Sequence, residues 1–138
     1  MHQIRQLRIV STLLLAFAIA QAGLGSGYLD GSRALLIAHA TNAFAVAVLA
    51  LISAVFGWNL RRTGNPSWTF YLPLTLVVAV GVQMSLGFAG VLGGHVFFGV
   101  LVLCTTTAYC SYAWRLRPDA AGGKGGATVR PPTAEKPR

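Results

Sequence analysis

The sequence predicts an all-α polytopic membrane protein, in which a bundle of four transmembrane helices is built from two parallel two-helix repeats. Composition is the first reason: 54% of the residues are hydrophobic and only 10% are charged, whereas a soluble domain carries about 25% charged residues. The second reason is the length of the apolar runs, and the third is a motif that occurs twice. The four-helix transmembrane domain is expected to cover residues 1–117.

Four apolar runs reach or approach the roughly 20 residues that a helix needs to cross the hydrocarbon layer of a bilayer. They cover residues 9–27, 34–60, 68–88 and 95–114, and the first helix is expected over about residues 7–24. Because lipid offers no hydrogen-bond partner to the backbone, each run is expected to be helical.

The connections carry turn and cap signals. The glycines and Asp30 of "GSGYLDGSR" predict an outer loop, and Ser32 is the expected N-cap of the second helix. In the next connection, Asn65 is expected to cap the third helix with Pro66 at its first position. The short, glycine-rich "GFAGVLGG" predicts that the last two helices are antiparallel neighbours.

The basic residues predict the topology. Ten of the eleven lysines and arginines fall on one side of a four-pass arrangement, and only Arg33 lies on the other. This bias places both termini in the cytoplasm, with the chain multi-pass in the plasma (inner) membrane. Three tryptophans mark the same cytoplasmic boundary. The positive charge is therefore explained by topology, and a lipid bilayer rather than nucleic acid is the expected partner.

The last stretch differs from the rest in composition. Residues 118–138 are rich in glycine and proline and contain no aromatic residue. Such a composition cannot bury enough apolar surface to fold, so it predicts a disordered cytoplasmic tail.

The repeated motif combines polar residues at matched positions. Q-x-x-L-G begins at Gln21 and again at Gln83, each followed by one histidine, His39 or His95. From each histidine, 19 residues lead to the tryptophan of a W-x-L-R sequence. Nineteen helical residues span about 28 Å, close to the full hydrocarbon thickness. Both imidazoles are therefore expected near the outer boundary, and a pseudo-two-fold axis along the membrane normal can bring them face to face.

Two facing imidazoles across an apolar bundle suit one haem b, with each histidine as an axial ligand to the iron. The macrocycle needs a slot lined by small residues. Gly99 lies one turn after His95. Along the His39 face the helix presents further small residues: Ala43, Ala47, Ala50, Ser53, Ala54 and Gly57.

Polar neighbours are available to support such ligands. Gln21, Gln83 and Asn42 are candidate partners for the second imidazole nitrogen, which commonly orients a metal-bound histidine. Arg33 is the one outer cation that can meet haem propionates. Electron transfer or haem handling near the outer face is the expected function.

Other interpretations stay open. A stripe of small residues on a membrane helix is often a packing face, and Gln–His pairs can simply lock helices together. The chain would then be a cofactor-free membrane adaptor or an assembly subunit of a respiratory or other membrane complex. A quinone-binding redox subunit is a third possibility. Zinc is disfavoured because a structural site usually needs four ligands. The only acidic residues, Asp30, Asp119 and Glu135, lie outside the expected helices, so no catalytic acid–base pair is indicated.

Over about residues 7–117 the chain resembles one half of the haem A synthase family, the cytochrome oxidase assembly proteins that modify haem O. Each half of those proteins is a four-helix bundle with histidines on its second and fourth helices and Q-x-x-L-G-like segments on the odd ones. The resemblance implies that His39 and His95 bind a b-type haem. A homodimer would restore the eight-helix arrangement of that family, and a respiratory-chain or haem-handling partner is implied.

The departures from the family concern its chemistry. Its catalytic half has an E-x-x-H-R pattern around the first histidine, where this chain has Leu36 and Ala40. The outer-loop cysteine pair of many bacterial members has no counterpart in "GSGYLDGSR". The chain is therefore not expected to make haem A, and no enzymatic activity is assigned.

Overall fold

A computed structural model describes residues 2–29 and 31–117 of the chain. Within these residues it contains four α-helices: α1 (His2–Leu29), α2 (Arg33–Arg62), α3 (Trp68–Phe88) and α4 (Leu92–Arg115). The expected all-α fold with four helices is confirmed. Each helix is long and apolar enough to cross a membrane. The predicted tail, residues 118–138, lies outside the described residues.

The connections at one end are shorter than predicted. Gly25 and Gly27 were expected in a loop, but both are helical and α1 continues to Leu29. Of the residues described there, Gly31 alone adopts the left-handed conformation of a turn, with φ 94°. At the other connection, Gly90 does the same with φ 71°. Glycine is tolerated inside these helices because it lets a neighbouring side chain approach closely.

The cap predictions have different outcomes. The Ser32 side chain accepts a hydrogen bond from the Leu35 backbone nitrogen, which confirms it as the N-cap of α2. The prediction for α3 was wrong, because its N-cap is Ser67 and Pro66 precedes the helix. The Asn65 side chain instead donates to the Leu60 carbonyl at 3.1 Å and completes the end of α2.

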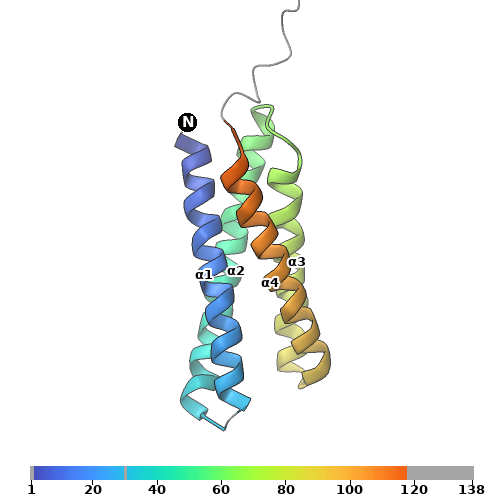
Figure 1. The fold of residues 1–138 in the computed structure, drawn as a ribbon. Helices are drawn as coiled ribbons and strands as arrows, with labels where there is room; N and C mark the ends of the chain where they lie inside the picture. The colour runs from blue at the N-terminus through green and yellow to red at the C-terminus, as the bar shows by residue number, and fades with distance from the viewer. Residues whose placement is uncertain (1, 30, 118–138) are drawn as a thin grey trace, which may run out of the picture.

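The helices form two antiparallel hairpins, α1–α2 and α3–α4, that lie side by side (Figure 1). We call the end that carries the N-terminus and the α2–α3 connection the tryptophan end, after Trp58, Trp68 and Trp114. The opposite end, with the α1–α2 and α3–α4 connections, is the histidine end. Figure 1 shows the hairpins close together at the tryptophan end and separated toward the histidine end.

Burial follows the same division. The buried residues of α1 stop at Ala18, those of α2 begin at Val46, those of α3 stop at Val80 and those of α4 begin at Val102. Every buried residue of the four helices therefore lies toward the tryptophan end. Over the remaining length of each helix, all described side chains are exposed or half-buried.

Much of the small-residue stripe on α2 serves packing rather than a cofactor slot. Ala50, Ser53, Ala54 and Gly57 are all buried in the tryptophan half. At Gly57 the backbone of Thr69 comes so close that no side chain would fit. Of the predicted stripe, only Ala43 lines a cavity. Small residues allow close approach of membrane helices, and this explains the rest of the stripe.

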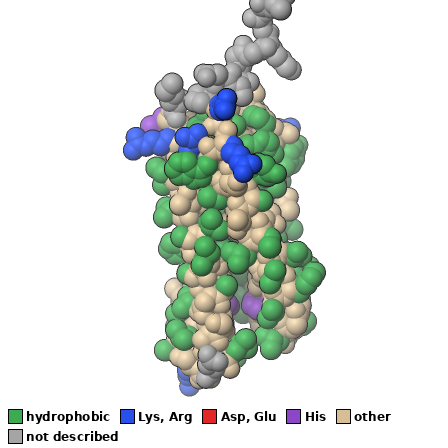
Figure 2. All heavy atoms as spheres, in the orientation of Figure 1, with side chains coloured by type: hydrophobic (Ala, Val, Ile, Leu, Met, Phe, Trp, Pro, Cys, Tyr) green, Lys and Arg blue, Asp and Glu red, His purple; other side chains and the backbone are tan. Residues whose placement is uncertain are grey.

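The first and last helices are joined at the tryptophan end. The Arg8 guanidinium donates to the carbonyl oxygens of Leu116 at 2.8 Å and Ala113 at 3.4 Å. It also lies over the Trp114 ring, 5.4 Å from its centroid. Figure 2 shows basic side chains gathered at this end of the molecule. Arg8 thus closes the bundle by satisfying carbonyls that the end of α4 leaves free.

Candidate functional site

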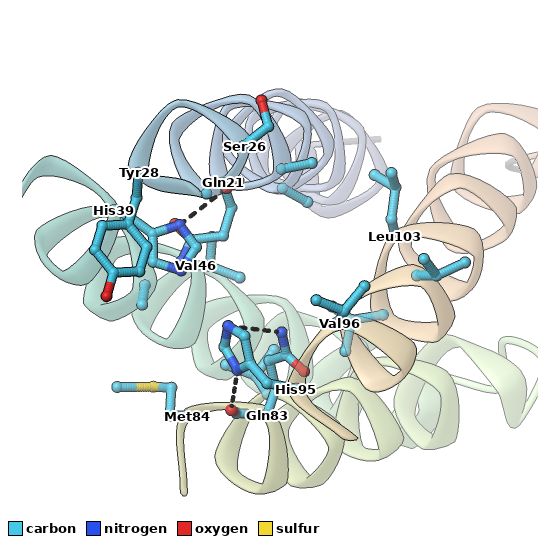
Figure 3. A pocket seen from close by; sticks show the side chains of 18 of the residues that line it. Gln21, Ser26, Tyr28, His39, Val46, Gln83, Met84, His95, Val96 and Leu103 are labelled. Carbon is cyan, nitrogen blue, oxygen red and sulfur yellow. Dashed lines mark hydrogen bonds between the residues drawn. The ribbon is translucent and has the colours of Figure 1, made fainter. Parts of the chain in front are cut away.

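The two helical histidines meet between the hairpins. His39 lies in the second turn of α2 and His95 in the first turn of α4, both at the histidine end. Their ring centroids are 5.9 Å apart, and the ring planes make an angle of 69°. Both rings point into the space between the hairpins (Figure 3). The structure therefore brings together two imidazoles that are 56 positions apart in the sequence.

The main chain of α1 holds His39. Its Nδ1 lies 3.0 Å from the backbone carbonyl oxygen of Gln21. A carbonyl oxygen can only accept, so Nδ1 carries the proton and Nε2 keeps its lone pair. The side-chain amide nitrogen of Gln21 lies 3.1 Å from Nε2 and donates to it. One glutamine thus fixes both the tautomer and the orientation of the ring.

Asn42 supports this arrangement indirectly. Its amide nitrogen donates to Oε1 of Gln21 at 2.7 Å and to the carbonyl oxygen of Phe17 at 2.9 Å. It has no hydrogen bond to the imidazole itself. Asn42 is therefore a positioning residue for the Gln21 amide, rather than a direct partner of His39 as the sequence suggested.

His95 repeats the backbone contact. Its Nδ1 donates to the carbonyl oxygen of Gln83 at 2.8 Å. The Gln83 amide nitrogen, however, is 3.5 Å from Nε2, which is long for a hydrogen bond. Oε1 of Gln83 is buried and has no hydrogen-bond partner among the described residues. His95 therefore has the same tautomer as His39, but its Nε2 accepts a weaker hydrogen bond.

The glycine that closes each Q-x-x-L-G motif makes room for the ring. A Cβ atom at Gly25 would lie 3.0 Å from Cε1 of His39, and one at Gly87 would lie 3.0 Å from Cε1 of His95. Each imidazole thus packs directly on helix backbone, one turn after the glutamine that holds it. The motif is a cradle for a histidine: glutamine supplies the carbonyl, and glycine supplies the space.

A cavity of about 280 Å³ lies between the hairpins and includes both imidazoles. It continues toward the histidine end as a second cavity of about 470 Å³, which shares His95, Tyr28, Leu29 and Leu92 with the first. Apart from the glutamines and histidines the walls are almost entirely apolar or glycine. Cofactor sites commonly have such walls and occupy about 300–1,000 Å³.

The two imidazoles are close enough to share one metal ion. Imidazole nitrogens bind first-row metals at about 2.0–2.1 Å and a ring centre lies about 1.1 Å beyond the nitrogen, so two rings on opposite sides of one ion have centroids about 6.2–6.4 Å apart. The observed separation is 5.9 Å, and each Nε2 lies next to the glutamine amide of its own hairpin. Among the described residues no third His, Cys, Asp or Glu joins the pair. His39 and His95 would therefore supply two ligands to a group that brings the others itself, such as a haem.

The remaining predicted residues differ in their roles. Gly99 lines the cavity, and a Cβ there would come within 2.8 Å of the Gln83 amide nitrogen. Arg33 begins α2 and lies outside both cavity walls. Tyr28 and Met84 were not predicted as site residues, but both line the cavity next to the imidazoles (Figure 3). Tyr28 is seven residues after Gln21, two helical turns along the same face, which is the signal that would have identified it.

Comparison of the chain with models of protein families, with curated proteins and with solved structures finds no match.

Proposed function

We propose that this protein is a small integral membrane protein that binds one haem b through His39 and His95 and serves electron transfer or haem handling near the outer face of the plasma membrane. The observation that carries the proposal is the matched presentation of the two rings. Each Nδ1 donates to a backbone carbonyl, so each Nε2 is free of a proton, and the centroids lie 5.9 Å apart. Each ring would thus offer its Nε2 as a ligand once the glutamine amide beside it moves away.

The chain's own groups would perform defined tasks. The two Gln carbonyls would fix the tautomer and the orientation of both imidazoles, and the walls around them would give the ligand an apolar surrounding. The Gln21 and Gln83 amides occupy Nε2 in the ligand-free protein and would turn aside when a metal takes their place. A bis-histidine haem iron exchanges single electrons and leaves no coordination position for a substrate. We therefore propose a carrier or holder of haem rather than an enzyme.

The proposed topology follows the charge bias. Arginines gather at the tryptophan end, so this end would face the cytoplasm, together with both termini. The two hairpins would then be parallel repeats that place the haem near the opposite surface. A homodimer, and a respiratory-chain or haem-handling partner, are further proposals that rest on the resemblance to a half of the haem A synthase family.

A spectroscopic experiment tests the haem. The protein is purified in mild detergent from haem-replete cells, and its dithionite-reduced-minus-oxidised spectrum is recorded. We expect the narrow bands of a low-spin b-type haem in the wild type. Both His39→Ala and His95→Ala should lose that low-spin spectrum, while His2→Ala, a histidine outside the site, should retain it. A colourless wild-type protein, or bands that survive both substitutions, would contradict the proposal.

One observation favours a second candidate, a cofactor-free adaptor or assembly subunit. Each imidazole already has a partner for both nitrogens within its own hairpin. The contacts of the two histidines are therefore explained without a cofactor, by a role in joining α1 to α2 and α3 to α4. In that case the wild type binds no iron, and both alanine variants unfold at a lower temperature than His2→Ala.

A further inference from the structure

The residues that line the cavity around the two imidazoles differ in exposure from one helix to another. The wall residues from α2 and α3 are all buried or half-buried. The exposed wall residues all come from α1 and α4. At the level of the imidazoles they are Ala22 and Ser26 on α1 and Val96 and Val100 on α4; the valines are 51% and 57% exposed. We call these four residues the portal.

The portal exists because, among the described residues, the hydrogen bonds that join α1 to α4 and Leu116 all lie at the tryptophan end. Arg8 and the Trp114–Thr12 hydrogen bond of 3.0 Å link the helices there. Beyond Ala18 on α1, and before Val102 on α4, neither helix has a buried residue. Figure 2 shows the result: a histidine side chain is visible through a gap between the two hairpins.

The chemistry of the portal indicates what it faces. Three of its residues are apolar, and the hydroxyl of Ser26 donates to the Gly23 carbonyl of its own helix at 3.2 Å. No polar group of the portal therefore needs water. Its flanks are the exposed apolar faces of helices that are long enough to cross a membrane. Such a side opening faces acyl chains, because an aqueous opening in a membrane bundle is lined by polar groups.

We infer that the site exchanges its ligand sideways with the bilayer, through the gap between α1 and α4. The inference rests on the proposed function, and the ligand is a tetrapyrrole dissolved in the lipid. The space between His39 and His95 is open toward the portal. A flat macrocycle would therefore reach both imidazoles between α1 and α4, without separation of the hairpins at the tryptophan end.

The test measures loading and release of haem in a defined membrane. Full-length protein is reconstituted in phosphatidylcholine vesicles, hemin is dissolved in the same bilayer, and the change in the Soret band is followed with time. Ala22→Phe narrows the portal. Ala20→Phe is the matched control, since Ala20 is an exposed alanine of the same helix outside the cavity walls. Leu86→Trp instead obstructs the histidine end, because Leu86 lines only the second cavity and not the one that holds both imidazoles.

We expect Ala22→Phe to slow both loading and release by about tenfold, because a gate raises the barrier for both directions. Ala20→Phe and Leu86→Trp should keep the wild-type rates. Val96→Phe, which narrows the portal from the α4 side, should repeat the slowing if Ala22→Phe fails to fold. Loading that is slowed by Leu86→Trp and not by the portal variants would overturn the inference and place access at the histidine end.

The proposed function and the route fail in different ways. A wild-type protein without a histidine-dependent Soret band contradicts haem binding itself. If the wild type has the histidine-dependent Soret band, and Ala22→Phe and Val96→Phe load hemin at the wild-type rate, only the lateral route is contradicted. Slower loading with faster release would mean that the new side chain occupies the site. This result would also contradict the inference that the portal is the route.

Discussion

In hairpin α1–α2, the hydrogen bonds that hold the His39 imidazole continue through Gln21 to Asn42, whereas in hairpin α3–α4 the corresponding chain stops at Gln83. Asn42 donates to Oε1 of Gln21 at 2.7 Å, but Oε1 of Gln83 has no partner in the described part of the chain. The amide nitrogen accordingly lies 3.1 Å from Nε2 in the first hairpin and 3.5 Å in the second.

The difference has a simple origin in the sequence. Asn42 follows His39 by three residues, and the residue three after His95 is Phe98, which cannot donate a hydrogen bond to the amide. The two hairpins therefore hold an imidazole on the equivalent backbone carbonyl, but only one has its supporting amide fixed. His39 is held more firmly than His95. In the proposed haem site His39 would be the preorganised ligand, and ordering His95 would cost part of the binding free energy.

Removal of an imidazole should give the largest effects on hemin binding, and these effects should differ between the two hairpins. We expect His39→Ala to weaken hemin binding by at least about 100-fold, at or beyond the top of the range for loss of an outer-shell group. His95→Ala should weaken it by about tenfold and leave a haem held by His39 alone. Titration of hemin into each detergent-solubilised variant measures both values. Equal losses would show that the extra support of His39 has no energetic consequence.

Removing the support alone should give a smaller effect. Asn42→Ala leaves Oε1 of Gln21 without its donor, and we expect a loss of about 1–3 kcal/mol in the free energy of unfolding. Hemin affinity should fall by about tenfold, toward the behaviour expected of the second hairpin. Thr41→Ala, at the exposed neighbouring position, is the control and should change stability by less than about 0.5 kcal/mol. An Asn42→Ala protein as stable as Thr41→Ala would remove the distinction between the hairpins.

The cradle glycines should give the smallest and most discriminating effect. Alanine gains up to about 1 kcal/mol over glycine in a helix, but crowding a packed ring costs about 1–3 kcal/mol. Because His39 is fixed, Gly25→Ala should destabilise by about 1 kcal/mol. Because His95 can shift, Gly87→Ala should be close to neutral.

Two glycines with open surroundings provide the controls for this comparison. A Cβ at Gly23 or at Gly81 would meet nothing within 4 Å. Alanine at either position should therefore stabilise the protein by about 0.5–1 kcal/mol. Thermal unfolding in detergent, followed by far-ultraviolet circular dichroism, compares all four variants. Identical behaviour of Gly25→Ala and Gly87→Ala would mean that the two rings are equally free to move.

The fold was accessible from the sequence because its signals are strong and local. Apolar runs and Ser32 each act within one helix or one turn, and both were identified correctly. The ends of α1 were not, since Gly25 and Gly27 look like turn residues. Gly25 packs against the His39 ring and Gly27 against the Leu35 side chain, both on α2. A sequence interpreted one segment at a time does not contain these contacts.

The site was accessible only in part. The equal spacing of His39 and His95 from their tryptophans predicted the level at which they meet. The acceptor of each Nδ1 was missed, because it is a backbone carbonyl, an atom that every residue has. Most of the small-residue stripe was wrongly assigned to a cofactor slot, because a sequence pattern of alanine and glycine is the same whether these residues face a helix or a cofactor. Distinguishing the two requires the separation of the hairpins in space.

The participation of both the first and the last helix in the cavity wall has a consequence for how the protein is made. Val96 and Val100 are synthesised long after Ala22, and the Arg8 contact with Leu116 joins residues 108 positions apart. During synthesis the earlier helices enter the membrane first. The compartment between the imidazoles is therefore complete only when the final helix has been released beside the first. Insertion of the proposed haem would then follow translation, because a chain truncated before α4 has His39 without His95.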